Sequence, residues 1–450
     1  MKDWRVLVQL SRQLMARAVI IIAPVVTLAV VLTASACRER VRDTNPPAPP
    51  PVLEPAPVTA VEPPAPAETA PKPRALPPIT TEPIVNIRLE RSRRIALALL
   101  DGGQLADGTA VQVTRTTITA QGDGIALGSL RFAVPLVISF ASHDRANFEL
   151  TSHATSTERY AGDLVIDRDG DEVVVAERIG IERYLAGVLA KEIEPDWPLE
   201  ALKAQAVAAR SYATVRWMER HDQTWQLDSS EQVDMAYAGY LAKVHPRLAL
   251  ALEQTRGNLL WYAEQPLPAF FHASSGGRTC DLASVWPDRR APDGVTRIDD
   301  AFVARFDQWA TTGEEVAPQR LGTWRCVVEL SDVRQRLQRY SKDIGAVGSL
   351  KIVERDAAGE RAVKVAVNHS RGRTILPAHA IRMAIGSTLI RSTLWTKVAV
   401  TPSKLVIEGR GYGHGVGMPQ ASAWAMSRNG QLAPAILNYF YPGATLVRKW

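Results

Sequence analysis

Residues 184–213 read YLAGVLAKEIEPDWPLEALKAQAVAARSYA, and this stretch decides how the chain is interpreted. Residues 181–190 have helical character, and Pro198 lies in the first turn of a second expected helix, where its missing N–H is tolerated. Glu200, in the same turn, is favoured by the positive end of the helix dipole. The apolar positions of the second helix recur at helical spacing and are mostly small: Leu199, Leu202, Ala206, Ala209 and Ala213. The sequence therefore predicts two closely packed helices with Glu192 at their junction.

Glu192 is the candidate for chemistry in this stretch. It ends the first expected helix at a proline-containing turn, next to an apolar segment that includes Trp197. An apolar wall raises the pKa of a carboxyl group, which suits a general acid near neutral pH. Lys203 and Arg210 are seven residues apart and share one helix face, where an arginine could orient a carboxylate or hold a substrate anion. By itself, the pattern also fits a capping or salt-bridging glutamate on an ordinary helical hairpin.

A second segment, residues 270–279, reads FFHASSGGRT. Adjacent glycines let a backbone approach a ligand closely, and hydroxyl and imidazole groups offer hydrogen bonds to sugars. The candidate binding residues here are His272, Ser274, Ser275, Gly276 and Gly277. The same pattern is also compatible with a tight turn that satisfies its own hydrogen bonds.

A third segment, residues 409–420, reads GRGYGHGVGMPQ and has glycine at every second position. If the segment is extended, Tyr412 and His414 share one face and the other face is bare backbone, which can lie against a ligand or another strand. The segment is not a phosphate loop, because it lacks the Lys-Ser/Thr pair of that motif. A glycine-rich packing strand with Tyr412 and His414 partly buried is the alternative.

These three segments resemble the SpoIID/LytB family. Its members carry a Tyr-Leu-x-Gly-Val motif that leads to a catalytic glutamate, then a Trp-Pro-x-Glu-Ala-Leu-Lys-Ala-Gln-Ala-Val-Ala-Ala-Arg run. They also carry an aromatic-His-Ser-x-x-Gly-Gly-x-Thr motif and a Gly-x-Gly-x-Gly-His-Gly-Val-Gly-Met-Ser-Gln motif. The family's glutamate falls on Glu192 here. Where members usually read Glu-Met-Pro, this chain reads Glu192-Ile193-Glu194-Pro195, so Glu194 is a second candidate.

The resemblance implies a lytic transglycosylase that cuts the glycan strands of peptidoglycan without a cofactor. A single glutamate then acts as acid and base, because the sugar's own C6 hydroxyl attacks C1 and gives a 1,6-anhydro end. The residues expected to position substrate are Lys203, Arg210, His272, Ser274, Ser275, Gly276, Gly277, Tyr412, His414 and Gln420. Some members are amidase enhancers, so a non-catalytic protein that binds peptidoglycan and activates a cell-wall amidase is the alternative.

The expected fold class is α+β. Residues 85–180 are predicted as a β-rich N-terminal part, because 84–89, 109–114 and 163–167 alternate apolar and polar side chains between turn signals. Residues 181–450 are predicted as a SpoIID-like catalytic domain of mixed helices and strands. Within it, a hairpin is expected across Ala358-Gly359, and the last motif should lead into a helix that stops at Asn429-Gly430.

The N-terminus predicts export. Residues 1–36 combine a positive start with an uncharged apolar run, typical of a signal peptide or a membrane anchor. Small residues precede Cys37, which indicates a lipidation site and a lipoprotein facing the periplasm or cell wall. Residues 37–84 are rich in proline and are expected to form an extended linker.

The charge and the cysteine content bear on nucleic-acid binding, disulfide formation and metal binding. The net charge is +6 and no basic block with interleaved aromatic residues is present, so the sequence does not indicate nucleic-acid binding. Cys280 and Cys326 could form a disulfide in an oxidising compartment or stay as buried thiols. With His272 they could also bind zinc, but the spacing matches no strong zinc motif and no metal site is predicted.

Overall fold

The computed structural model describes residues 78–151, 157–286, 298–316 and 321–450. These residues belong to one compact unit. The predicted signal peptide or anchor, the lipidation site at Cys37 and all but the last residues of the linker lie outside the described residues. Within the described ranges, no helix is long and apolar enough to cross a membrane.

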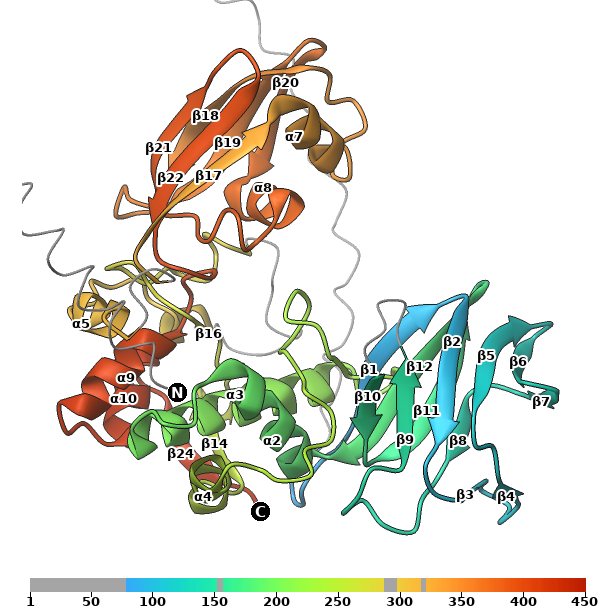
Figure 1. Cartoon of the computed structure of the whole chain (residues 1–450). Coiled ribbons are helices and arrows are strands. Elements are labelled where there is room, and N and C mark those ends of the chain that lie inside the picture. Colours follow the sequence, from blue (N-terminus) through green and yellow to red (C-terminus); the bar gives the residue numbers. More distant parts are fainter. Residues whose placement is uncertain (1–77, 152–156, 287–297, 317–320) are drawn as a thin grey trace, which may run out of the picture. The chain divides into compact units, whose positions relative to one another are not determined.

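The N-terminal part is rich in β-strands, as the alternating sequence predicts, and contains two larger sheets and the small two-stranded sheet β3-β4 (Figure 1). One sheet has the order β13-β1-β12-β11-β8 and the other β10-β9-β2-β5-β6-β7. The predicted strands at 84–89 and 163–167 are present as β1 and β11, whereas 109–114 contributes only the two-residue β4. The strands are β1 Ile84–Ser92, β2 Arg94–Leu99, β3 Gly103–Gln104, β4 Ala110–Val111, β5 Thr116–Gln121, β6 Gly124–Leu127, β7 Leu130–Phe132, β8 Leu136–Ile138, β9 Phe148–Thr151, β10 Thr157–Tyr160, β11 Asp163–Asp169, β12 Glu172–Gly180 and β13 Leu227–Asp228.

The predicted helical pair is confirmed as α2 (Ile181–Glu192) and α3 (Leu199–Glu219). Helix α3 is buried along nearly its whole length. Its many alanines let α2, α4 (Pro246–Gln254), α9 (Gln420–Arg428) and α10 (Ala433–Phe440) approach it closely. Residues 250–275 are only partly β, because α4 occupies the start. The strands there are β14 Asn258–Tyr262, β15 Gln265–Pro266 and β16 Phe271–His272.

Residues 323–410, which we call the insertion, build a second hydrophobic core of their own around Trp395, Val365 and Ile407. Two three-stranded sheets, β17-β22-β21 and β18-β19-β20, enclose this core with α7 and α8. The predicted hairpin at 350–367 is confirmed, with Gly359 in the left-handed conformation of its turn. The elements are β17 Thr323–Glu329, α7 Leu330–Leu337, β18 Val347–Arg355, β19 Ala362–His369, β20 Gly372–Pro377, α8 Ala378–Ile385, β21 Trp395–Val400 and β22 Lys404–Arg410.

The main core continues after the insertion. Val416, Met418 and Ile436 pack in the same cluster as the N-terminal sheets and α2. Helix α9 ends at the predicted Asn429-Gly430, where Gly430 has φ 78°. The remaining elements are η1 Ile298–Ala301, α5 Ala310–Glu314, β23 Met418–Pro419, α9 Gln420–Arg428, α10 Ala433–Phe440 and β24 Thr445–Arg448. The α+β class is confirmed, and the insertion is a separate core that the sequence did not reveal within 181–450.

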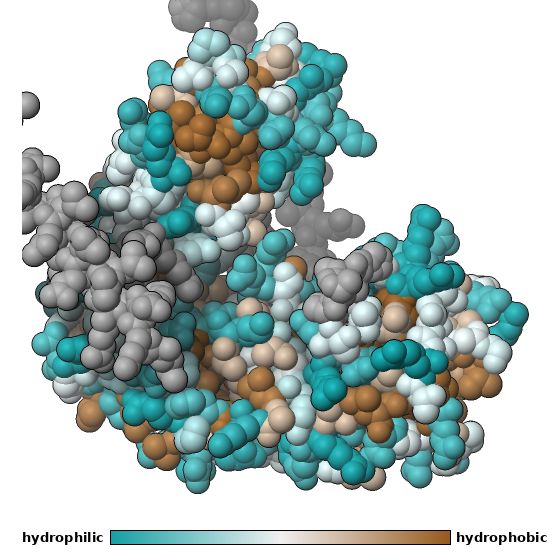
Figure 2. Space-filling view, in the orientation of Figure 1, coloured by the Kyte–Doolittle hydropathy of each residue, from teal (hydrophilic) through white to brown (hydrophobic). Residues whose placement is uncertain are grey.

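Figure 2 shows a hydrophobic area over the strands of the insertion, where Figure 1 labels β18, β21 and β22. On the outward face of β17, Val327 is 46% exposed, and its cross-strand partner on β22 is Val406. The opposite face of the same strands carries the core residues Cys326 and Ile407. Strands β17 and β22 therefore have apolar side chains on both faces.

Candidate active site

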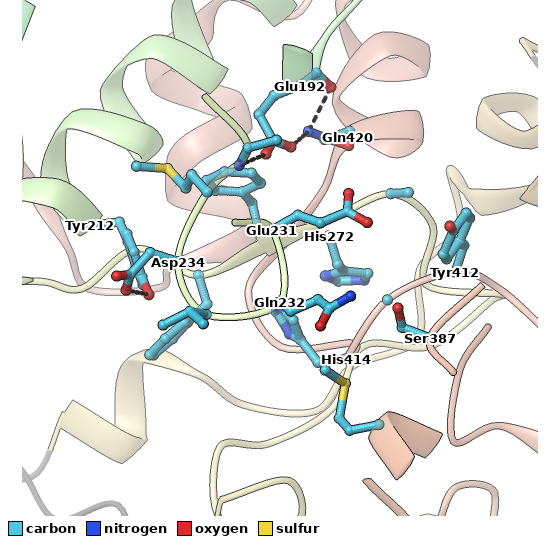
Figure 3. A pocket seen from close by; sticks show the side chains of 18 of the residues that line it. Glu192, Tyr212, Glu231, Gln232, Asp234, His272, Ser387, Tyr412, His414 and Gln420 are labelled. Carbon is cyan, nitrogen blue, oxygen red and sulfur yellow. Dashed lines mark hydrogen bonds between the residues drawn. The ribbon is translucent and has the colours of Figure 1, made fainter. Parts of the chain in front are cut away.

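A cavity of about 340 Å³ brings together segments that are far apart in the chain. Helix α2, the segment before α4, the β16 segment, the glycine-rich segment after β22 and helix α8 of the insertion all contribute. Figure 3 shows Glu192 and Gln420 together at one end, with His414 and Ser387 toward the other. Its lining residues are Lys191, Glu192, Tyr212, Arg216, Glu231, Gln232, Val233, Asp234, Met235, Ala236, Phe270, Phe271, His272, Ala273, Trp286, His379, Arg382, Met383, Ser387, Tyr412, Gly413, His414 and Gln420.

Glu192 is held in the cavity by two other segments. Its Oε1 accepts a hydrogen bond from the backbone N–H of Ala236 at 3.1 Å. The amide of Gln420 donates to the backbone oxygen of Glu192 at 3.1 Å and lies 3.5 Å from its Oε2 (Figure 3). By contrast, Glu194 is exposed and does not line the cavity. The carboxyl group of Glu192 therefore has a fixed position at the end of α2, with the side chain of Gln420 directly beside it.

Arg210 is completely buried, and its role in the fold is clear from its contacts. Its Nε and Nη2 donate to the two carboxylate oxygens of Glu182 at 2.9 and 2.8 Å. Burial alone would raise the pKa of Glu182, but the hydrogen bond and charge of Arg210 hold that pKa below its usual value. Glu182 also accepts from the backbone of Gly257 and from the indole of Trp450. Of the two uses that the sequence allowed, Arg210 therefore orients a carboxylate of the fold.

Lys203 also lies outside the cavity. It pairs with Glu200 at 2.7 Å on the first turn of α3. Neither Lys203 nor Arg210 lines the cavity, so their positions do not support the substrate contacts expected of them. Trp197 is likewise absent from the lining; the aromatic wall comes from Phe270, Phe271 and Trp286 instead.

In the FFHASSGGRT segment, His272 reaches the cavity while the serines and glycines are used in the turn itself. The hydroxyl of Ser274 donates to Glu314 at 3.0 Å, and that of Ser275 to Asp307 at 2.6 Å. Gly276 and Gly277 have φ of 68° and 107°, and a Cβ on Gly276 would meet backbone at 2.8 Å. The backbone N–H groups of Gly276 and Gly277 donate to the hydroxyls of Ser274 and Ser275 within the turn. The four small residues thus shape the support of His272, partly through bonds within the turn and partly through bonds to other segments.

The glycine-rich segment is not extended, which corrects the expectation of a strand with one bare face. Gly411, Gly413, Gly415 and Gly417 have φ between 71° and 115°, a region that favours glycine over all other residues. A Cβ on Gly413 would lie 2.5 Å from Cβ of His272. Repeated left-handed residues fold the chain against the β16 segment, and this loop carries Tyr412 and His414 into the cavity.

The two histidines hold opposite tautomers. Nδ1 of His272 lies 3.1 Å from the carbonyl oxygen of Val416, so this nitrogen carries the proton. Nδ1 of His414 accepts the N–H of Val416 at 3.1 Å, so its proton is on Nε2. Burial lowers the pKa of His272 to about 3 and that of His414 well below its usual value. Both rings are therefore neutral at neutral pH, and Nε2 of His272 is a buried acceptor with no protein partner among the described residues.

Indole and imidazole rings from the main body and from the insertion together form one wall of the cavity. The Trp286 ring lies 5.1 Å from His414 and 5.5 Å from His379 of helix α8, and His414 lies 5.4 Å from His272. Burial lowers the pKa of His379 to about 4, so this third imidazole is also neutral near pH 7. An apolar wall with neutral polar edges suits a sugar, which presents both C–H faces and hydroxyl groups.

Asp234 is a cavity carboxylate whose hydrogen-bonding capacity is taken up by the protein. It accepts from the hydroxyl of Tyr212 at 2.8 Å, from Arg220 at 3.0 Å and from the backbone N–H of Asp228 at 3.0 Å. Its side chain is fully buried. Among the carboxyl groups that line the cavity, Asp234 therefore fixes the local loop, whereas Glu192 is the one placed beside Gln420.

Sequence reasoning missed several lining residues, above all Trp286, His379 and Arg382. Each lies in a segment without a recognisable motif, and two of them belong to the insertion. No local spacing brings them into the cavity that contains Glu192; the packing of the insertion against the main body does so for His379 and Arg382, and the packing of the main core does so for Trp286.

Cys280 and Cys326 are both free thiols. Cys280 is buried in the main core, where burial raises its pKa to about 12, and Cys326 is buried in the core of the insertion. The structure therefore has no disulfide between them. In the described part of the chain, no group of three or more His, Cys, Asp or Glu side chains could hold a metal ion.

Comparison with known proteins confirms the predicted resemblance. Residues 169–262, which contain Glu192, match the SpoIID family model, described as stage II sporulation protein. Residues 302–417, which include the insertion, match a separate domain of unknown function, DUF8618.

Three curated proteins are similar to this chain over more than half of its length. An amidase enhancer of Bacillus subtilis is 32% identical over 301 residues, which cover 58% of this chain and 40% of that protein. Stage II sporulation protein D of the same organism is 26% identical, covering 60% of this chain and 75% of that protein. An uncharacterised protein of Brachyspira hyodysenteriae is 25% identical, covering 64% of this chain and 72% of that protein.

Proposed function

We propose that this chain, which carries a SpoIID domain at residues 169–262, acts on the bacterial cell wall by cutting peptidoglycan glycan strands as a lytic transglycosylase. The observation that carries the proposal is the placement of Glu192 in a cavity with an aromatic wall, held by Ala236 and Gln420. The similarity to stage II sporulation protein D supports the same class of role.

The chemistry requires one carboxyl group that works twice. In its acid form, Glu192 donates its proton to the glycosidic oxygen as the bond from that oxygen to C1 breaks. The C6 hydroxyl oxygen of the muramic acid unit that contains this C1 then attacks C1. As it does so, the carboxylate of Glu192 takes the proton of that hydroxyl group. The products are a 1,6-anhydro end and a free hydroxyl on the neighbouring sugar, and no water is consumed. Because the nucleophile belongs to the substrate, a second catalytic carboxylate is not needed.

The neutral histidines fit this scheme as binding groups. Since the pKa values of His272 and His414 are lowered by burial, neither ring is an acid at neutral pH. Nε2 of His272 can accept a sugar hydroxyl, and Tyr412 lines the same cavity. Acid–base work is therefore assigned to Glu192 and substrate positioning to His272, His414, Tyr412 and Gln420.

The test is a digest of denuded glycan strands by the full-length protein, with products identified by mass. A lytic transglycosylase gives products about 18 Da lighter than hydrolysed sugars, the mass of one water. Glu192→Gln should reduce the rate by about 10²–10⁴-fold, the usual contribution of acid–base catalysis. The matched control is Glu194→Gln, which changes an exposed carboxylate two residues away and should cut at the parental rate.

Two results would contradict this proposal. Hydrolysed ends would identify a glycosidase that uses water, and a Glu194→Gln variant as defective as Glu192→Gln would remove the special status of Glu192. Circular dichroism and thermal unfolding of both variants show whether a lost rate reflects lost folding.

A non-catalytic amidase enhancer is the second candidate, favoured by the 32% identity to the Bacillus subtilis protein of that name. The discriminating experiment adds the purified chain to a cell-wall amidase acting on intact peptidoglycan. Stimulation that persists in Glu192→Gln, together with no anhydro product from the parent, would establish this function in place of the first.

Export and anchoring are proposed on sequence grounds. Cell fractionation should find the protein with the membrane, through an N-terminal anchor or a lipid on Cys37. Cys37→Ala should release the protein if lipid is the anchor and leave it in place if residues 1–36 span the membrane.

A further inference from the structure

We propose that Arg382 of the insertion forms a subsite for the lactyl carboxylate that a muramic acid unit exposes once its stem peptide has been removed. The inference rests on the proposed action on glycan strands, and it assigns to the insertion the selection of denuded strands. It concerns substrate recognition and leaves the bond-breaking role with Glu192.

Arg382 lies on helix α8 and lines the same cavity as Glu192, although only 6% of its surface is exposed. Its Nε donates to the carbonyl oxygen of Arg391 at 3.2 Å, and its Nη1 lies 3.4 Å from the sulfur of Met383. Neither partner carries a negative charge, and Nη2 makes no hydrogen bond to any described residue. The guanidinium group of Arg382 is therefore held in one orientation, and part of its hydrogen-bonding capacity is left for a ligand.

A buried cation normally has a carboxylate partner, because leaving water is costly for a charge. Between residues 78 and 450, outside the three undescribed segments, no Asp or Glu lies within ion-pair distance of Arg382. Tyr412 and Glu231 act electrostatically to raise the pKa of Arg382, but Glu231 is an exposed residue that makes no ion pair with it. Burial and the neighbouring charge of Arg361 lower the pKa of Arg382 to about 10, which still leaves it charged at neutral pH.

The surroundings of Arg382 suit a sugar that carries one negative charge. His379, on the same helix, is neutral near pH 7 and has a buried Nδ1 with no partner among the described residues. Trp286 packs against His379, and Ser387 follows α8 at the cavity wall. Figure 3 places Ser387 near Tyr412 and away from Glu192, so polar groups line the cavity beyond the catalytic end.

The substrate itself offers a matching group. A glycan of N-acetylated sugars has only hydroxyl and acetamido groups, which are neutral. When the stem peptide is present, the lactyl carbonyl of muramic acid is part of an amide; when the peptide is removed, the same carbon becomes a carboxylate attached directly to the sugar. An arginine fork binds a carboxylate with two parallel hydrogen bonds, and a charge-assisted pair in a buried site is strong. The stem peptide also carries carboxylates, but these are attached through flexible chain.

The experiment measures binding and cleavage separately in the full-length protein. Binding is measured by calorimetry in the Glu192→Gln background, so that the ligand stays intact, and cleavage is measured with Glu192 present. The ligands are denuded glycan strands, the same strands with the lactyl carboxylate converted to a methylamide, peptide-bearing strands, and chitin oligosaccharides, which lack the lactyl group. Arg382→Met removes the charge, and Arg373→Met is the matched control because Arg373 is an exposed residue of the same insertion.

We expect the parent background to bind denuded strands about 10–100-fold more tightly than methylamide strands. Arg382→Met should abolish this preference and leave the affinity for methylamide strands and chitin oligosaccharides unchanged. Arg373→Met should bind all four ligands like the parent. Peptide-bearing strands should bind like the methylamide form.

Three outcomes would overturn the subsite. These are equal affinity of the parent background for denuded and methylamide strands, a preference that survives Arg382→Met, and an Arg382-dependent preference for peptide-bearing strands. The last result would identify a peptide carboxylate as the ligand instead.

The two proposals fail in different ways. Cleavage of both denuded and methylamide strands, together with equal affinity of the parent background for the two, would sink the subsite and leave the transglycosylase standing. Arg382-dependent binding of denuded strands without any cleavage would sink the transglycosylase and keep the subsite.

Discussion

Arg210 and Arg382 are both buried arginines on helices, yet their surroundings differ in one respect. Arg210 has a carboxylate partner, Glu182, held by two hydrogen bonds of 2.8 and 2.9 Å. Arg382 has a carbonyl oxygen and a sulfur as its partners, and it faces a cavity. The first charge is satisfied inside the fold, and the second is available to a ligand. The comparison shows that burial of an arginine does not by itself reveal its use; the partner does.

The largest effect expected from this comparison is on stability. Glu182→Ala leaves Arg210 buried and unpaired, and it also removes the acceptor of Gly257 and Trp450. Loss of one member of a buried ion pair typically costs about 3–5 kcal/mol of unfolding free energy. Lys203→Ala, on the same helix as Arg210, breaks a partly exposed pair and should cost less than about 1 kcal/mol. Urea denaturation measures both values, and a similar cost for the two variants would remove the distinction between a buried and a surface pair.

An intermediate effect is expected from pH, through the histidines that share the cavity with Arg382. The lowered pKa values, about 3 for His272 and about 4 for His379, mean that the unfolded chain binds protons more readily than the folded one. Their contribution to stability is complete above pH 6.5 and is lost progressively as the pH falls toward 4.

His272→Gln tests this directly. Between pH 7 and pH 4.5, the variant should lose about 2 kcal/mol less unfolding free energy than the parent, because one histidine no longer resists protonation. Identical profiles for the two proteins would show that His272 is not held neutral by the fold.

The smallest change in unfolding free energy is expected for a substitution of Arg382 itself. This substitution is the most direct test of the difference between Arg382 and Arg210. Arg382→Met removes a charge without a carboxylate partner and keeps an unbranched side chain of similar reach, so the unfolding free energy should change by less than about 1 kcal/mol. Thermal unfolding without ligand measures this. A loss as large as that of Glu182→Ala would mean that Arg382, like Arg210, serves the fold.

Local patterns in the sequence predicted much of the fold around Glu192. The helical pair, the hairpin across Gly359 and the end of α9 at Gly430 follow from spacing, alternation and glycine, all of which act over a few residues. Other features depended on partners that the sequence does not identify. The same helix face that predicted a substrate contact for Arg210 is buried against Glu182. The glycine-rich segment is a loop in which Gly413 packs against His272 and Gly417 against the backbone of Phe270.

The sequence by itself determined the helical junction that carries Glu192. It also placed glycine at positions where the backbone has positive φ. It also determined the resemblance that comparison confirmed. Only the tertiary structure decided that Ala236 and Gln420 hold Glu192, that the histidines are neutral, and that Trp286 and Arg382 share the cavity. The physical reason is that helix and turn preferences are set by neighbouring residues, whereas burial, charge pairing and pKa depend on segments brought together by packing.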